Sequence, residues 1–287
     1  MIQAEHVSYT YTPGGVFEKA AVKDVSFTIE DGTFCGLIGH TGSGKTTLVQ
    51  LLAGLLRPTS GTILVDGLDI GEKKNRQNGF HGKVGLVFQY PEYQLFGETV
   101  LEDVMFGPLN MKLSKEEAEL RARTALLDTG LDEGLFKKSP FELSGGQKRR
   151  VAIAGVLALH PTFLMLDEPT AGLDPVGRDE ILEAIYALHK RENMTVLLVS
   201  HSMEDMAKYA ERIFVMDGGN LSMDASPHAV FSETEALRKM GLGVPEMANV
   251  IHALRQKGLP LPEGIYTIEA AKEAILKLWE ERKCSEI

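Results

Sequence analysis

Nine consecutive residues near the N-terminus have the types and the spacing that bind phosphate groups. Residues 39–47 read Gly-His-Thr-Gly-Ser-Gly-Lys-Thr-Thr, which fits the pattern G-x-x-x-x-G-K-T. Glycines in such a stretch allow backbone angles that a side chain would forbid, and they let N–H groups approach an anion. Lys45 is predicted to reach the β- and γ-phosphates and the Thr46 hydroxyl to hold Mg²⁺, with Thr47 as a further phosphate donor. The predicted nucleotide-binding residues are Gly39, His40, Thr41, Gly42, Ser43, Gly44, Lys45, Thr46 and Thr47.

The residues on either side of this stretch predict the two elements that must hold it. Residues 34–38 form a short apolar run that predicts a buried strand, and apolar residues at helical spacing predict a helix over residues 45–55. The amino-terminal end of such a helix directs its positive dipole end toward the phosphates. An accidental glycine-rich turn, which is the alternative interpretation, would lack this strand–loop–helix context.

Two consecutive carboxylates, Asp167 and Glu168, end a second apolar run over residues 163–166. If this run is a parallel strand, the pair lies at the carboxyl edge of the sheet, where ligands bind. We expect Asp167 to hold Mg²⁺ through water and Glu168 to polarise a water molecule for attack on the γ-phosphate. The dipeptide alone is a weak signal, and the phosphate-binding stretch upstream makes it a strong one.

A third group, residues 143–147, reads Leu-Ser-Gly-Gly-Gln and precedes a helix predicted over residues 145–159. A serine and two glycines at a helix amino terminus form a second anion site. Because one nucleotide already has a helix of its own, we expect this group to contact the nucleotide of another subunit. An N-capped helix with a flexible turn is the alternative. The residues concerned are Ser144, Gly145, Gly146 and Gln147.

These three motifs, together with Gly172-Leu173-Asp174 and His201, resemble those of ATP-binding cassette (ABC) ATPases. The resemblance covers about residues 1–230, and no residue expected from the family is missing or replaced. In such ATPases two nucleotide domains sandwich two ATP molecules head to tail. The resemblance therefore implies ATP and Mg²⁺ as cofactors and a second ATPase as partner.

The resemblance also implies roles for individual residues of this sequence. It implies that Tyr11 stacks on adenine, that Gln89 contacts Mg²⁺ and the attacking water, and that His201 contacts the γ-phosphate. Asp174 would lie at the dimer interface, and residues 144–147 would serve the partner's ATP. Taken singly, Tyr11 and His201 would be read as structural residues.

A narrower resemblance lies in residues 88–96, which read Phe-Gln-Tyr-Pro-Glu-Tyr-Gln-Leu-Phe. This form, the run over residues 149–158 and the C-terminal extension resemble the ATPases of energy-coupling factor importers, which take up vitamins or transition metals. The tyrosine after Phe-Gln resembles the second of their two related ATPases. The implied partners are a homologous ATPase, in a heterodimer or alternatively a homodimer, a transmembrane scaffold, and a substrate-binding membrane subunit.

The segment over residues 91–96 predicts where such a scaffold docks. It leaves the sheet because a proline stops the preceding strand. Tyr93, Leu95 and Phe96 are expected to form the apolar floor of a groove for an amphipathic helix of the scaffold. Glu92 is expected to pair with an arginine on that helix. The alternative is that the three apolar residues pack inside the helical subdomain.

Strands that alternate with helices predict an α/β fold, a P-loop NTPase cassette with a mainly parallel sheet. A turn signal at Asp31-Gly32 favours a hairpin, so the early strands are expected to form an antiparallel β subdomain. Residues 1–235 are predicted to be the nucleotide-binding domain, with a helical subdomain at about 91–150. Residues 236–287 are predicted to be a helical extension that acts either as a lid or in assembly.

Composition excludes several classes of protein. The 287 residues carry a net charge of −10 and a pI of about 5.4, so we expect no nucleic-acid partner, because sequence-independent binding needs a basic face. The N-terminus does not read as a signal peptide, and the longest apolar run, residues 151–159, is shorter than the about 20 residues of a membrane span. Two lone cysteines, Cys35 and Cys284, indicate a reducing compartment. We expect a soluble protein that docks peripherally on the cytoplasmic face of the cell membrane.

Three other functions stay open from the sequence. The first is the ATPase of another ABC importer, for cobalt, nickel or an amino acid. The second is a soluble ABC ATPase of ribosomes or DNA, although such chains usually have two cassettes or a long coiled coil, and this chain has neither. The third is a small-molecule kinase, against which the Leu-Ser-Gly-Gly-Gln motif and His201 count. The sequence does not name the transported compound, because a cassette never touches it.

Overall fold

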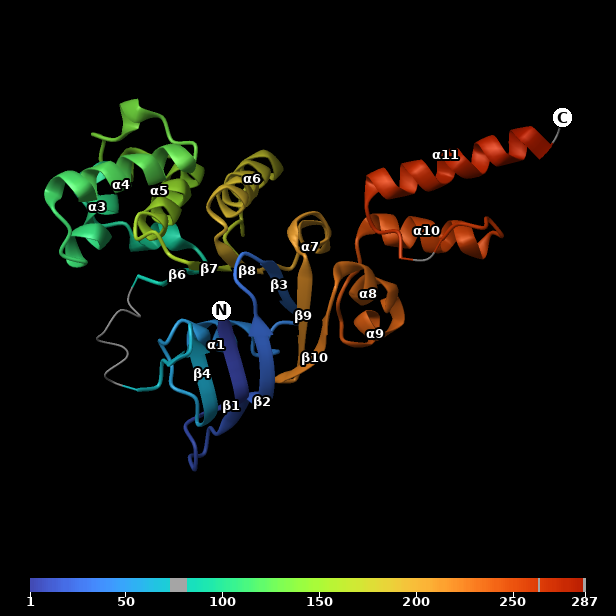
Figure 1. Cartoon of the computed structure of the whole chain (residues 1–287), viewed down its shortest axis with the longest axis horizontal. Helices are drawn as coiled ribbons and strands as arrows, with labels where there is room; N and C mark the ends of the chain where they lie inside the picture. Colours follow the sequence, from blue (N-terminus) through green and yellow to red (C-terminus); the bar gives the residue numbers. More distant parts are fainter. Residues whose placement is uncertain (73–81, 263, 286–287) are drawn as a thin grey trace. The chain divides into compact units, whose positions relative to one another are not determined.

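The computed structural model describes residues 1–72, 82–262 and 264–285 of the chain (Figure 1). The chain divides into two compact units, of which the first comprises residues 1–34 and 46–199 and the second residues 35–45 and 200–287. Residues 72–82 are polar, which predicts a loop, and this stretch lies mostly outside the described residues. The domain boundary predicted after residue 235 stays a prediction.

An antiparallel sheet in the first unit confirms the predicted β subdomain. Its strand order is β2-β1-β4-β5, and each neighbouring pair is antiparallel. From Val25 to Ile29 the strand β2 buries alternate residues, because successive side chains of a strand point to opposite faces. Asp31-Gly32 forms no hairpin, since β2 pairs with β1 and the next strand, β3 (Phe34–Gly39), pairs with β9. The bounds are β1 Ile2–Tyr11, β2 Lys19–Ile29, β4 Ser60–Val65 and β5 Leu68–Asp69.

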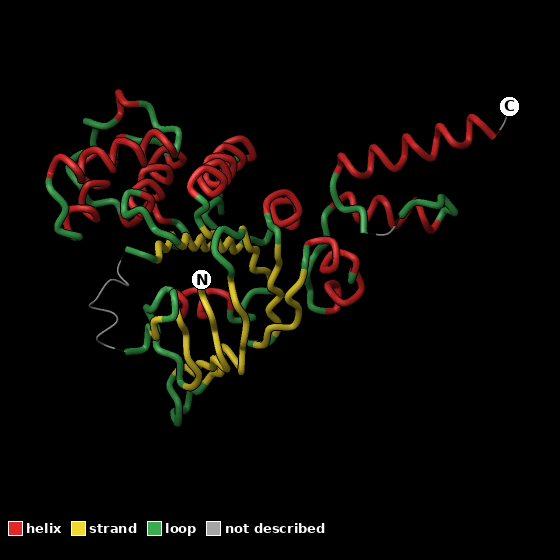
Figure 2. The backbone as a smooth tube through the Cα atoms, in the orientation of Figure 1, coloured by secondary structure: helices red, strands yellow, loops and turns green. Residues whose placement is uncertain are grey.

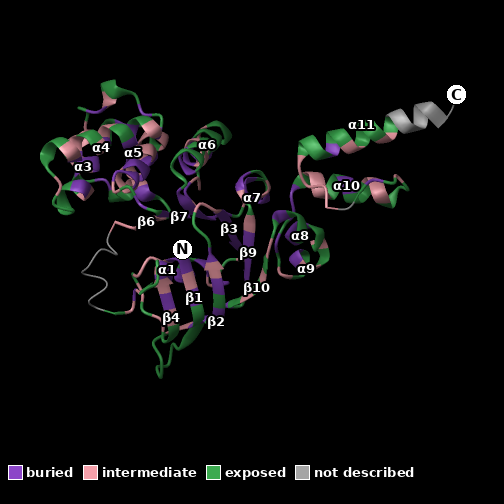
Figure 3. Cartoon of the chain, in the orientation of Figure 1, coloured by how far each residue is buried: buried purple, intermediate pink, exposed green. Residues whose placement is uncertain are grey.

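Three parallel strands in the first unit position the predicted acidic pair. The strand β7 (Phe163–Asp167) lies between β6 (Val84–Val87) and β8 (Thr195–Val199) and is parallel to both. All residues of β7 and β8 are buried, as expected for central parallel strands (Figure 3). The helix α6 (Pro175–Glu192) connects β7 to β8. Because parallel strands end at the same edge, residues directly after β6 and β7 come together.

The helical subdomain of the first unit follows β6. Three of its helices, α3, α4 and α5, pack on one another (Figure 2). Residues 114–117 read Ser-Lys-Glu-Glu, a pattern that predicts a helix start. Ser114 caps α4 by accepting a hydrogen bond from the backbone N–H of Glu117 over 3.2 Å, which confirms this start. The bounds are η2 Pro91–Gln94, α3 Val100–Asn110, α4 Lys115–Asp128, η3 Glu133–Leu135, η4 Pro140–Glu142 and α5 Gly145–Leu157.

The second unit is built on β3, which is buried along its whole length and pairs in parallel with β9. A hairpin joins β9 to β10 in antiparallel register. The helix α1 (Lys45–Leu52) begins at the end of this unit and continues into the first. The bounds of the other elements are α7 Met203–Tyr209, β9 Arg212–Asp217, β10 Asn220–Ala225, α8 Pro227–Ser232 and α9 Thr234–Lys239.

The C-terminal part of the second unit contains two helices, α10 (Glu246–Gln256) and α11 (Ile268–Ser285). Their common core is formed by Ile251, Leu261 and Ala271. The sequence predicts one apolar stripe of Ile268, Ala271, Ile275, Leu278 and Trp279 in α11. The prediction is only partly correct, because Ala271 and Leu278 pack in this core while Ile268 and Trp279 are exposed. Among the described residues, no helix is both long enough and apolar enough to cross a membrane.

Candidate functional site

The predicted site residues fall into two groups, one in each compact unit. The second unit contains Gly39, His40, Thr41, Gly42, Ser43, Gly44, Lys45 and His201. The first unit contains Tyr11, Thr46, Thr47, Gln89, Ser144, Gly145, Gly146, Gln147, Asp167, Glu168 and Asp174.

The glycines of the phosphate-binding stretch are required by the local backbone. A Cβ atom on Gly39 would lie 2.5 Å from the carbonyl oxygen of Met216 and 2.5 Å from the Oγ atom of Ser43. Gly42 and Gly44 have φ angles of +83° and +106°, which side chains disfavour. The tight turn between β3 and α1 therefore needs glycine at all three positions.

Polar groups converge inside this turn. Lys45 is 6% exposed, and its Nζ atom donates to the carbonyls of Gly39 over 2.7 Å and of His40 over 3.1 Å. The Oγ atom of Ser43 is buried and has no hydrogen-bond partner among the described residues. Both groups lie in a glycine-rich turn at the amino terminus of a helix. A phosphate ligand fits this arrangement, because it can accept hydrogen bonds from the Lys45 ammonium and the Ser43 hydroxyl. The imidazole Nε2 of His40 lies 3.2 Å from the Oδ1 atom of Asp217, which steadies the turn from outside.

Tyr11 and Thr47 meet in the first unit. The Tyr11 hydroxyl lies 3.1 Å from the Oγ1 atom of Thr47, at the start of α1. The ring of Tyr11 stands edge-to-face with that of Tyr9, with centroids 4.9 Å apart. The ring predicted to stack on adenine is thus fixed beside the helix that also carries Thr46.

Gln89 and Glu168 are brought together, as their positions after neighbouring parallel strands require. The Nε2 atom of Gln89 donates to the Oε2 atom of Glu168 over 3.2 Å. Gln89 is exposed and Glu168 is partly exposed, so both polar groups are accessible from solvent. Glu168 has a φ angle of 50°, a left-handed conformation that residues other than glycine rarely adopt. The structure therefore pairs an amide with a carboxylate whose backbone is strained.

The remaining predicted residues lie at ends of elements. Asp167 is the buried last residue of β7, and His201 is exposed shortly after β8. Asp174 caps α6, because its Oδ1 atom accepts a hydrogen bond from the N–H of Gly177 over 2.7 Å. The described residues contain no cluster of three or more His, Cys, Asp or Glu side chains that would form a metal site by themselves. Mg²⁺ in phosphate sites uses few protein ligands, so Asp167 still suits that ion.

The amino terminus of α5 is capped and open. The Ser144 Oγ atom accepts from the N–H of Gln147 over 3.3 Å, and the Gln147 Oε1 atom accepts from the N–H of Ser144 over 3.0 Å, which completes a capping box. A Cβ atom on Gly145 would meet no atom within 4 Å, and one on Gly146 would meet a single leucine methyl at 4.0 Å. The fold therefore does not require glycine at these two positions, and each glycine destabilises the helix by about 1 kcal/mol relative to alanine. The two glycines leave room for something that approaches the helix end.

Comparisons with known proteins agree with this geometry. A family model described as ABC transporter matches residues 22–171, which is more than half of the chain. The Clostridium acetobutylicum protein named energy-coupling factor transporter ATP-binding protein EcfA2 is 55% identical over 283 residues, which is 98% of this chain and 99% of the relative. The chain belongs to the energy-coupling factor group of the ABC transporter family. The family resemblance predicted from the motifs, including the second of the two related ATPases, is confirmed, and the protein is an ATP-binding ATPase.

Solved structures support the predicted cassette fold of this ABC ATPase. The structure of cbiO1 from Clostridium perfringens, described as part of the ABC transporter complex cbiONQ, is 37% identical with a TM-score of 0.74 and covers 88% of this chain and 98% of that one. A dimeric ATP-binding cassette in a post-hydrolysis state, bound to ADP and Pi, is 31% identical with a TM-score of 0.71. It covers 79% of this chain and 99% of its own.

An ion pair inside the ATPase corrects the prediction for Glu92. Its Oε1 and Oε2 atoms accept hydrogen bonds from Nη2 and Nε of Arg149 over 2.6 and 3.0 Å. The two side chains are 15% and 2% exposed, so the carboxylate expected to face a scaffold arginine is held by an arginine of its own chain. Helical spacing could have indicated this, because Arg149, Ile153 and Leu157 share the buried face of α5 and a buried arginine needs an acidic partner.

Of the three residues predicted to form an apolar groove floor, one is buried and two are exposed. Leu95 is buried, so for this residue the alternative of packing inside the helical subdomain is correct. Tyr93 and Phe96 are 84% and 61% exposed. The ring of Phe96 packs edge-to-face on that of Phe106 in α3, with centroids 4.8 Å apart, and Phe106 is also exposed. Three exposed aromatic side chains therefore follow Gln89 along the chain: Tyr93 in η2, Phe96, and Phe106 in α3, of which Phe96 and Phe106 are in contact. Together they are called the exposed aromatic patch.

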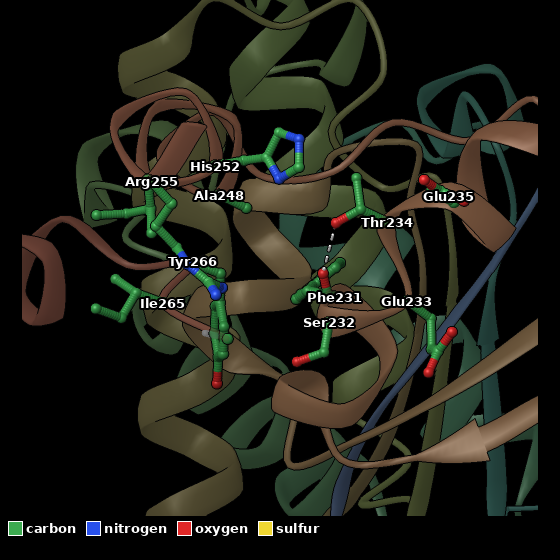
Figure 4. A pocket seen from close by; sticks show the side chains of 12 residues that line it. Phe231, Ser232, Glu233, Thr234, Glu235, Ala248, His252, Arg255, Ile265 and Tyr266 are labelled. Carbon is green, nitrogen blue, oxygen red and sulfur yellow. Dashed lines mark hydrogen bonds between the residues drawn. The ribbon is translucent and has the colours of Figure 1, made fainter. Parts of the chain in front are cut away.

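The second unit of the ATPase also contains an open pocket of about 350 Å³ among α8, α9, α10 and the residues before α11 (Figure 4). His252 and Arg255 of α10 line one side, and Ser232 and Thr234 line another. Burial raises the pKa of the Tyr266 hydroxyl, which also lines it. None of the described lining residues is one of the predicted site residues.

Proposed function

We propose that this chain is the ATP-hydrolysing subunit of an energy-coupling factor importer for a vitamin or similar micronutrient. It pairs with a second homologous ATPase on the cytoplasmic face of the cell membrane. The pair docks on a transmembrane scaffold, which holds a separate substrate-binding membrane subunit. The observation that carries the proposal is the 55% identity, over 98% of the chain, to a relative named as an energy-coupling factor transporter ATP-binding protein.

Within this proposal the chain holds ATP by its phosphates and its adenine. Lys45 and the N–H groups of residues 39–45 bind the β- and γ-phosphates, and Tyr11 stacks on the adenine. The buried ammonium and the unsatisfied Ser43 hydroxyl support this role. Thr46, Gln89 and Asp167 would hold Mg²⁺, which neutralises phosphate charge when bound.

The general base of hydrolysis in this proposal is Glu168, whose carboxylate is hydrogen-bonded to the amide of Gln89. Glu168 accepts a proton from the attacking water, and Gln89 orients both the water and the carboxylate. The 3.2 Å hydrogen bond between the two side chains supports this division of roles. His201 contacts the γ-phosphate.

The amino terminus of α5 is assigned to the ATP of the partner ATPase. The Ser144 hydroxyl accepts a capping hydrogen bond and can still donate one, because a hydroxyl does both. The open space at Gly145 and Gly146 supports the approach of a ligand from outside the chain. Asp174 would lie at the same dimer interface.

The experiment that tests the proposal is purification of the tagged full chain from detergent-solubilised membranes of the cells that make it, followed by mass spectrometry. We expect a second ATPase of the same family, a multi-span membrane protein and a small membrane protein in constant proportions. Purified complexes should hydrolyse ATP and release phosphate. Recovery with ribosomal or DNA-bound proteins, and without membrane proteins, would contradict the proposal.

The Lys45→Ala variant is expected to bind ATP roughly 10- to 100-fold more weakly, because a charge-assisted contact to the phosphates is lost. Calorimetric titration of the purified chain with ATP measures this. Lys239→Ala is the control, since Lys239 is an exposed lysine of the same unit. Equal affinities of the two variants would exclude Lys45 from the phosphate site.

Replacing Tyr93 and Phe96 with aspartate together is expected to release the ATPase from its membrane partners, because the exposed aromatic patch would lose its apolar surface. Both side chains are exposed, so the melting temperature of the isolated chain should change little. Pull-down of the membrane subunits measures the effect. Leu120→Asp is the control, because Leu120 is as exposed as Phe96 but lies in α4. Full retention of the partners by the double variant would rule out docking at this patch.

A further inference from the structure

One arginine is buried where three segments of the first unit meet. Arg149 is 2% exposed and forms the ion pair with Glu92 in η2. Its Nη1 atom also donates to the carbonyls of Pro169 over 3.2 Å and of Ala171 over 2.5 Å, in the loop after β7. The planar guanidinium thus joins α5, η2 and this loop by four hydrogen bonds, two of them a bidentate pair with Glu92, whereas a lysine ammonium has only three donors on one nitrogen.

The two segments that Arg149 joins to α5 each have a residue with a strained backbone at or beside the proposed hydrolytic site. Tyr90, directly after Gln89, has a φ angle of 56°, and Glu168 has one of 50°. Such conformations persist where the surroundings fix them. The Arg149 guanidinium lies 5.6 Å from the centre of the Tyr90 ring, and the carbonyl of Pro169 that it holds directly follows Glu168. One side chain therefore fixes the two loops from which Gln89 and Glu168 extend.

We propose that Arg149 is a positioning residue for ATP hydrolysis. It holds the loops after β6 and β7 against the helix that begins at Ser144, and this sets the geometry of the pair formed by Gln89 and Glu168. The inference rests on the proposed role of Glu168 in hydrolysis. Because Arg149 acts through the backbone and through Glu92, its replacement changes the rate of hydrolysis more than the affinity for ATP.

The Arg149→Lys variant tests this, because lysine keeps the positive charge and loses the donor fork. In the full chain with its copurified subunits, we expect kcat to fall roughly 10- to 100-fold and KM for ATP to change less than about threefold. Arg150→Lys is the matched control. Arg150 also donates to a carbonyl, that of Thr129, and to a carboxylate, that of Glu180, but neither partner borders β6 or β7. The control is expected to keep its kcat.

Combination with Glu168→Gln distinguishes positioning from a general structural role. If Arg149 acts through Glu168, adding Arg149→Lys to Glu168→Gln lowers the residual rate by less than about threefold, because residues that act as a unit are not additive. If Arg149 only supports the fold, the double variant loses the full factor of the single Arg149 variant. That additive result, or an unchanged kcat in folded Arg149→Lys, overturns the inference.

A second variant keeps the test decisive if Arg149→Lys does not fold. Glu92→Asp keeps the carboxylate charge but shortens its reach to Arg149, and it is expected to lower kcat while KM stays close to that of the unmodified chain. An unchanged kcat in this variant overturns the inference. Failure of the proposed function gives a different result, because in that case the Glu168→Gln variant itself would show unchanged turnover. If only the Arg149 and Glu92 variants are without effect, the proposed function stands and the inference alone is wrong.

Discussion

The Glu168→Gln variant is expected to hydrolyse ATP roughly 10²–10⁴-fold more slowly than the unmodified ATPase, the range lost when a general base is removed. Glutamine has the shape of glutamate and can still contact Gln89, whose amide donates to the carboxylate over 3.2 Å. It cannot accept a proton from water. ATP binding should therefore remain, and the variant should accumulate as an ATP-bound dimer. Phosphate release and size-exclusion chromatography with ATP measure the two effects.

Glu133→Gln is the control for this variant, because Glu133 is an exposed glutamate of the same unit in η3. It should hydrolyse ATP at the unmodified rate. Near-normal turnover in Glu168→Gln would remove the role assigned to Glu168. A loss of ATP affinity comparable to the loss of turnover would point instead to a role in binding.

Ser144→Arg is expected to lower hydrolysis in the assembled ATPase by roughly 10²-fold or more, because a preorganised donor to the partner's phosphates is lost and a bulky side chain fills the open helix end. The isolated chain should bind ATP almost as well as before, since Ser144 serves the nucleotide of the other subunit. ATP affinity of the single chain and turnover of the complex are compared. A large loss of affinity in the single chain would place Ser144 in its own nucleotide site and remove this argument for a sandwich dimer.

The same substitution also removes the N-cap of α5, which costs about 0.5–2 kcal/mol of stability. Ser114→Arg provides the matched control, because Ser114 caps α4 through the same type of hydrogen bond, from its Oγ atom to the N–H of Glu117. Both variants should lose a similar amount of thermal stability. Only Ser144→Arg should lose hydrolysis, and equal losses of activity would show that capping alone explains the effect.

Motifs with local causes could be predicted from the sequence. The turn around Gly39 needs glycine for reasons that lie within a few residues and one neighbouring strand. The contact between Gln89 and Glu168 follows from the parallel order of β6 and β7, because Glu168 is the first residue after β7 and Gln89 is the second after β6. The helix cap at Ser114 and the capping box at Ser144 each depend on four consecutive residues only.

Features that depend on distant pairing were not predictable in this way. Glu92 reads as a surface charge until α5 places Arg149 against it, and the two residues are 57 positions apart. In α11 the buried face contains Ala271, Ala274 and Leu278 and is displaced around the helix from the predicted stripe, so the spacing of the large apolar residues did not show that Ile268 is exposed. Asp31-Gly32 has the composition of a hairpin turn, yet the chain there leaves one sheet for another. In each case tertiary packing decides between local alternatives of similar energy.

The buried pair of Glu92 and Arg149 has a consequence for how such chains can diverge and be recombined. Losing either partner alone leaves an uncompensated charge in a nearly dry place, which costs about 3–5 kcal/mol in comparable pairs. The two positions therefore cannot drift independently, and a change at one is tolerated when the other changes with it. A chimera that exchanges residues 88–96 between related ATPases, for instance to alter which scaffold is bound, must carry residue 149 from the same parent.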